Sequence, residues 1–98
     1  MKIYLSGPIS GTVDYMERFA EAERDLTNDG AIVVNPAKIL SYLPEDTTWE
    51  QYMELSLVML KMCDAICLLE GWESSNGAAL ENAEAVKLGL KRFQQVED

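Results

Sequence analysis

Short apolar segments alternate with longer amphipathic segments along the whole chain, and this alternation constrains the fold more than any other feature. Four segments bounded by turn-forming residues are predicted to be strands: residues 2–6, 31–34, 64–69 and 91–96. Three longer segments have helical periodicity: residues 14–29, 47–62 and 76–88. This order predicts an α/β fold with a mostly parallel sheet. No linker or repeat interrupts it, so residues 1–98 are expected to form a single domain.

Composition excludes several classes of function. The 98 residues include 17 acidic and 8 basic side chains and no histidine, with a formal net charge of −9. Without histidine there is no Ser-His-Asp triad and no His-ligated metal. The acidic balance argues against nucleic-acid binding, which requires a cationic surface. No apolar run approaches the roughly 20 residues that cross a bilayer, and no signal peptide is evident. We therefore expect a cytoplasmic protein without membrane association.

The loops after the predicted strands hold the first candidate binding residues, because ligands of parallel α/β folds gather at the carboxyl ends of the strands. The loop over residues 6–11, which begins at the last residue of the first predicted strand, contains Ser6, Gly7, Pro8, Ser10 and Gly11. Its glycines allow the backbone to approach a ligand closely, and the N–H groups of the following helix could bind a phosphate. The alternative is an ordinary turn with capping serines.

The last predicted helix carries a carboxylate on its apolar side. Ala78, Glu81 and Ala85 share one helical face, where a charge is costly unless it is hydrogen-bonded or has a chemical task. The nearby helix N-terminus favours the ionised form, which a carboxylate nucleophile requires. The alternative is a glutamate at the rim of a helix that packs slightly differently.

The helix over residues 47–62 is apolar on two sides. Thr47 and Glu50 have the spacing of a capping box. The stripe expected to face inward contains Trp49, Tyr52, Met53, Ser56, Met59, Leu60 and Cys63. A second apolar side consists of Leu55, Val58 and Met62. A subunit contact is the simplest use of that second side, so we expect a homodimer or a higher homo-oligomer.

Three polar or aromatic residues allow two interpretations each. Ser56 interrupts the inward stripe, where a serine can simply bond the carbonyl four residues earlier. Trp49 and Trp72 could stack on a nucleobase, although tryptophan belongs more often to a core or an interface.

Four motifs together resemble the nucleoside 2-deoxyribosyltransferase superfamily, and in particular a small uncharacterised branch of it from bacteria and phages. They are Lys2-Ile3-Tyr4-Leu5-Ser6-Gly7-Pro8, Asn35-Pro36-Ala37, Cys63-Asp64-Ala65-Ile66 and Ser75-x-Gly77-x-x-x-Glu81. The resemblance covers nearly the whole chain and weakens after Gly89. It implies a flavodoxin-like (Rossmann-like) α/β fold, a three-layer sandwich around a small, mostly parallel sheet.

The same resemblance implies cleavage of the N-glycosidic bond of a 2′-deoxynucleoside or its 5′-monophosphate. Glu81 matches the catalytic nucleophile of the family, and Tyr4 matches the tyrosine that orients it. No metal or cofactor is expected. The small-molecule substrate is expected to contact Ser6, Gly7, Pro8, Ser10, Gly11, Asn35, Ser56, Trp72, Ser75 and Gly77.

Two departures from the family pattern keep other functions open. Ser56 stands where the family has an aspartate, and a serine cannot act as the acid that helps the base to leave. Ser75 stands where the transferases have another aspartate, whereas the nucleotide-hydrolase branch has a serine that holds the 5′-phosphate. The first alternative is therefore a catalytically weak or inactive nucleotide-binding or sensing domain. A second alternative is a phage or host accessory protein whose two-sided apolar helix serves only assembly.

Overall fold

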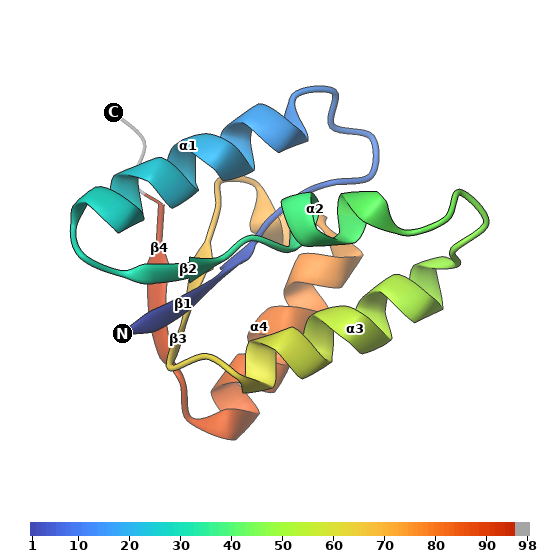
Figure 1. Cartoon of the computed structure of the whole chain (residues 1–98). Helices are drawn as coiled ribbons and strands as arrows, with labels where there is room; N and C mark the ends of the chain where they lie inside the picture. The colour runs from blue at the N-terminus through green and yellow to red at the C-terminus, as the bar shows by residue number, and fades with distance from the viewer. Residues whose placement is uncertain (96–98) are drawn as a thin grey trace.

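The computed structural model describes residues 1–95, and the predicted strands and helices follow one another in the predicted order, with a short helix over Pro36–Ile39 after the second strand (Figure 1). The strands are β1 (Lys2–Ser6), β2 (Ile32–Val34), β3 (Ala65–Leu68) and β4 (Lys91–Gln94). The α-helices are α1 (Tyr15–Asn28), α2 (Pro36–Ile39), α3 (Trp49–Lys61) and α4 (Asn76–Leu88), and two short 3₁₀ turns cover Leu40–Tyr42 and Trp72–Ser74. The predicted last strand extended to Val96, which lies outside the described residues.

The four strands form one parallel sheet in the order β2-β1-β3-β4. Helix α1 covers one face of this sheet, and α3 and α4 pack side by side on the other (Figure 1). The protein is therefore a three-layer α/β sandwich, which confirms the predicted flavodoxin-like class. None of the helices within residues 1–95 has the length and apolar character needed to cross a bilayer.

The central strand β1 is buried on both faces, and its side chains alternate between the two halves of the core. Ile3 and Leu5 belong to the cluster under α1, whereas Tyr4 belongs to the cluster under α3 and α4. Because successive side chains of a strand point to opposite faces, Ser6 lies on the same face as Tyr4. Strand β1 thus presents two hydroxyl groups to the helices α3 and α4.

The start of α3 corrects one prediction. The capping box is formed by Thr48 and Gln51: the Gln51 backbone N–H donates to Thr48 Oγ1 over 3.1 Å, and Gln51 Oε1 accepts from the Thr48 backbone N–H over 2.9 Å. Thr47 was predicted to cap the helix together with Glu50, but its hydroxyl donates to the carbonyl of Pro44 instead. Thr47 therefore belongs to the loop before α3, and the N-cap of the helix is Thr48, one residue later than predicted.

The second apolar side of α3 is exposed, as expected for residues off the inward stripe. Leu55, Val58 and Met62 expose 42%, 58% and 61% of their surface. Trp49 was predicted to lie in the inward stripe, but it is 47% exposed. Trp49 is the first residue of α3, and Figure 1 shows that the start of this helix lies beyond the ends of the strands.

Candidate active site

The carboxylate of Glu81 is buried between α4 and β1, and a hydroxyl group of β1 binds each of its two oxygens. The Tyr4 hydroxyl donates to Oε2 over 2.5 Å, and the Ser6 hydroxyl donates to Oε1 over 2.6 Å. Glu81 lies on the second turn of α4 and is only 6% exposed. The carboxylate predicted on the apolar face of this helix is therefore hydrogen-bonded, which lowers the cost of its burial.

Burial controls the protonation of this group. Desolvation raises the pKa of Glu81 above its usual range, while the hydroxyls of Ser6, Tyr4 and Ser56 act in the opposite direction. The helix N-terminus was expected to favour the ionised form, but desolvation by burial is the largest contribution, and on balance the pKa is raised. Burial, followed by the nearby Glu81, raises the pKa of Tyr4 well above 10, so the phenol stays a neutral hydrogen-bond donor.

A cavity of about 810 Å³ opens at the carboxyl end of the sheet, and Glu81 lies in its wall. Most of the predicted site residues line this cavity: Tyr4, Gly7, Pro8, Ser10, Ser56, Ser75, Gly77 and Glu81. Among the residues that the structure describes, Glu81 is the only charged one in the lining. A ligand in this cavity would therefore meet one carboxyl group, several hydroxyls and no cation.

Four predicted substrate contacts lie outside the lining of this cavity. Ser6 is only 1% exposed and is directed to Glu81. Asn35 caps α2 by accepting from the Lys38 backbone N–H, and its side-chain amide donates to Glu23. Gly11 has a φ of +76° in the turn before α1, and Trp72 packs against the core cluster that contains Tyr4. Ser6 and Asn35 are thus hydrogen-bonded within the protein and Trp72 packs on its core, whereas Gly11 is exposed.

Gly7 has a packing role in addition to its place in the cavity wall. A Cβ atom at this position would lie 2.8 Å from Cβ of Leu69, closer than side chains approach each other. The loop after β1 can therefore lie against the end of β3 only with glycine at residue 7.

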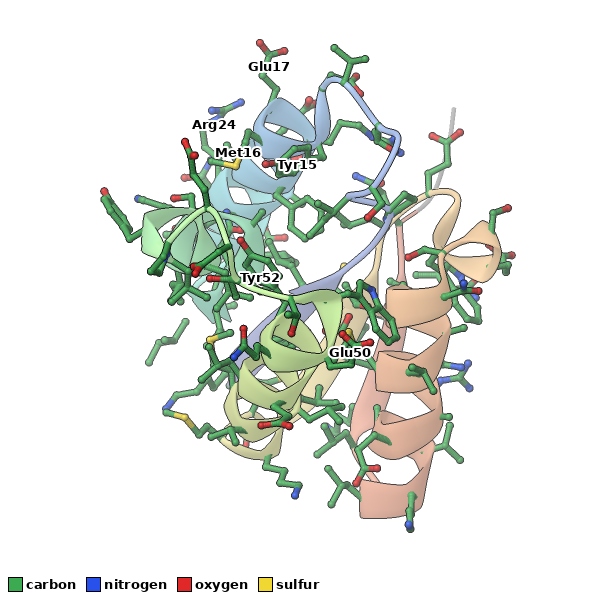
Figure 2. The ribbon with its side chains drawn as sticks, turned by 90° about the vertical axis from the view of Figure 1, so that its right-hand side faces the viewer. Tyr15, Met16, Glu17, Arg24, Glu50 and Tyr52 are labelled. Atoms are coloured by element: carbon green, nitrogen blue, oxygen red, sulfur yellow. The ribbon has the colours of Figure 1, made fainter. Side chains whose placement is uncertain are left out.

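Aromatic side chains form a large part of the cavity wall. Two of them, Trp49 and Tyr52, were placed by helical periodicity in the inward stripe of α3. Tyr15, Phe19, Trp49 and Tyr52 all line the cavity. In Figure 2, Tyr15 comes from the first turn of α1 and Tyr52 from α3. The available signal was their place near the helix N-termini, which lie at the same edge of the sheet as the strand ends. Such rings offer flat apolar surfaces for a planar ligand.

The start of α4 supplies polar groups to the same cavity. Ser75 is the N-cap, and its hydroxyl accepts from the backbone N–H of Ala78 over 3.2 Å. Ser74, Asn76 and Gly77 also line the cavity. The first N–H groups of a helix have no partner within the helix and carry a partial positive charge. This part of the wall can therefore hold an anionic or strongly polar group.

Comparison with solved structures defines the class of fold. The structure resembles that of a 2-deoxyribosyltransferase from the psychrotolerant bacterium Bacillus psychrosaccharolyticus, with a TM-score of 0.77 and 19% sequence identity. The match covers 100% of this chain and 77% of that protein. The resemblance noted in the sequence is thus confirmed as a shared fold. The chain itself belongs to the family described as "Domain of unknown function (DUF4406)", whose sequence profile matches residues 1–93. A search of curated proteins found no match.

Proposed function

We propose that this protein cleaves the N-glycosidic bond of 2′-deoxynucleosides or their 5′-monophosphates, with Glu81 as the nucleophile. The observation that carries the proposal is the placement of Glu81: its carboxylate lies in the wall of a cavity whose other described lining residues are uncharged, and hydroxyl groups of β1 bind both of its oxygens. A nucleophile must be fixed relative to its target, and these two hydrogen bonds supply that fixation.

The proposed reaction proceeds in two displacements at C1′. A carboxylate oxygen of Glu81 attacks C1′ and forms an ester, while the C1′–N bond breaks and its electron pair goes to the leaving base. The base takes up a proton. Water or a second base then attacks C1′, the C1′–O ester bond breaks, and the carboxylate is released. Two displacements at one carbon retain its configuration.

Protonation of the leaving base is the slow step of the proposed reaction, because the cavity has no general acid at Ser56. Ser56 is buried, and hydrogen bonding by its hydroxyl group lowers the pKa of both Tyr4 and Glu81, against the larger effect of burial. A serine hydroxyl is too weak an acid to protonate a leaving base. The proton must therefore come from solvent, and we expect slow turnover.

The start of α4 supports a preference for 5′-phosphates. Ser10 and Ser75 offer hydroxyl groups, and the first turn of α4 offers backbone N–H groups at the same cavity. Because no described lining residue is a lysine or an arginine, the preference over the bare nucleoside should be modest, about 1–3 kcal/mol.

A second candidate function follows from Ser56. A protein that kept the cavity and lost the acid would bind a nucleotide without turning it over, as a sensing domain does. The same hydroxyl-lined, aromatic cavity supports both functions, and only the fate of the glycosidic bond separates them.

The test uses chromatography of the purified protein incubated with a panel of deoxynucleosides and their monophosphates, with and without a second free base. We expect release of free base by the parent protein and by Glu84→Gln, and none by Glu81→Gln. Glu84 lies on the same helix, outside the cavity lining, so its variant controls for the loss of one carboxylate. Binding without release for every substrate would favour the sensing domain.

A further inference from the structure

Strand β1 places the hydroxyl groups of Tyr4 and Ser6 on one face of the sheet, and each donates a hydrogen bond to a different oxygen of the Glu81 carboxylate. Tyr4 and Ser6 are two residues apart on this central strand, which pairs with β2 on one side and β3 on the other. In the pairing with β3, Tyr4 lies opposite Ile66 and Ser6 opposite Leu68. The backbone of both residues is therefore held by strand pairing within the sheet and not by a loop.

The Ser6 side chain is not accessible from the cavity. It is 1% exposed, it is absent from the cavity lining, and its hydroxyl donates to Glu81 Oε1. A substrate phosphate in the cavity cannot reach it without displacing this hydrogen bond. The role expected for Ser6 from the loop sequence, binding a ligand, does not fit this placement.

Two donors on different oxygens restrict a carboxylate more than one donor does. The last torsion of a glutamate side chain is broad, so a carboxylate held at one oxygen can still rotate about its terminal bond. With Tyr4 on Oε2 and Ser6 on Oε1, the plane of the Glu81 carboxylate is defined. Attack on a carbon centre depends on such alignment, and small misplacements lower the rate strongly.

We propose that Ser6 is a positioning residue, which together with Tyr4 holds the Glu81 carboxylate in one orientation toward the cavity. This inference rests on the proposed function for its effect on catalysis, while the hydrogen bond itself can be tested without any substrate.

The experiment compares Ser6→Ala with Cys67→Ala. Cys67 is a buried residue of β3 that belongs to the core cluster on the opposite face, so its variant controls for the loss of one buried atom from the sheet. The first measurement follows the side-chain carboxyl signal of Glu81 by NMR during a pH titration. Because the Ser6 hydroxyl stabilises the charged carboxylate, its removal should move the titration midpoint of Glu81 to higher pH. Cys67→Ala should leave the midpoint where it is.

The second measurement follows base release as a function of pH. For Ser6→Ala we expect kcat to fall about 10- to 100-fold, the loss typical of one hydrogen bond to a charged group, with little change in KM. The acid limb of the profile should move to higher pH in step with the NMR midpoint. Ser6→Thr, which restores a hydroxyl, should recover part of both changes. If the threonine does not fold, the comparison of Ser6→Ala with Cys67→Ala decides alone.

The outcomes separate this inference from the proposed function. A Glu81 midpoint that is the same in Ser6→Ala as in Cys67→Ala overturns the positioning role. A shifted midpoint in a protein that releases no base supports the positioning of Glu81 and contradicts the glycosidic activity. A raised KM with unchanged kcat in Ser6→Ala would contradict the positioning role and would indicate that Ser6 contacts the substrate.

Discussion

The Tyr4 hydroxyl donates a 2.5 Å hydrogen bond to Glu81 Oε2, which joins the first strand of the protein to its last helix. Both side chains are buried, and burial raises the pKa of each group. The phenol therefore remains a neutral donor, and the carboxyl group is held in a protein environment that opposes its charge. A buried carboxyl group with a shifted pKa in a cavity wall is a candidate for a functional site.

The first prediction concerns the pH dependence of stability. The folded-state pKa of Glu81 is raised, so its contribution to stability is complete below the unfolded-state pKa and is lost as pH rises through the folded-state pKa. In Glu81→Gln the side chain does not ionise, so its stability does not fall in this way as pH rises. The variant should therefore be more stable than the parent at neutral pH. The free energy of unfolding, measured with urea at several pH values, tests this. A difference between the two proteins that does not grow as pH rises would contradict the raised pKa.

A second prediction concerns Ser56. In Ser56→Asp a second carboxyl group would face the buried Glu81, and two carboxyl groups that share a site cannot both ionise easily. One of them should stay protonated near neutral pH and could protonate the leaving base. General acid catalysis contributes about 100- to 10,000-fold, and we expect the variant to recover part of this factor in base release. Ser56→Asn, which has a similar size and no acid, should show no gain. Equal rates for the two variants would contradict the missing-acid explanation.

A third prediction concerns the 5′-phosphate. Ser75→Ala should weaken binding of a deoxynucleoside monophosphate more than binding of the bare nucleoside, because Ser75 lines the cavity at the start of α4. Loss of an N-cap also costs about 0.5–2 kcal/mol of stability. Thr48→Ala removes the N-cap of α3 and controls for that cost. Calorimetry should show a selective loss for the monophosphate only in Ser75→Ala, and an equal loss for both ligands would argue against a phosphate contact.

A fourth prediction concerns self-association through α3. Val58 is 58% exposed between Leu55 and Met62 on the apolar side of this helix. Sedimentation at micromolar concentration should show a dimer or larger species for the parent protein and a smaller one for Val58→Lys. Thr27→Lys, on the exposed side of α1, should behave like the parent. A parent protein that is monomeric at this concentration would refute the interface.

The sequence predicted the order of elements and the position of Glu81 because both depend on local periodicity. Ala78, Glu81 and Ala85 are all buried on one face of α4, as their spacing indicates. Of the two residues of β1 that bind Glu81, Tyr4 was expected from the family resemblance and Ser6 was not. Because β1 is buried on both faces, its apolar pattern does not show which side chains lie under which helix, and Ser6 was assigned to the loop.

Two smaller differences have the same origin in tertiary contacts. Residues 47–50 and 48–51 both satisfy the capping-box pattern, and the hydrogen bond from Thr47 to Pro44 decides between them. Helical periodicity placed Trp49 on the inward side of α3, but it cannot show that the sheet ends before the first turn of the helix. Trp49 lines the cavity beyond the strand ends.

The most direct test of the central claim is mass spectrometry of the protein after incubation with a deoxynucleoside and a rapid acid quench. The account predicts a covalent deoxyribosyl adduct on the peptide that contains Glu81, present in the parent protein and in Glu84→Gln and absent from Glu81→Gln. Release of base without any adduct on that peptide, or with an adduct at another residue, would contradict the assignment of Glu81 as the nucleophile.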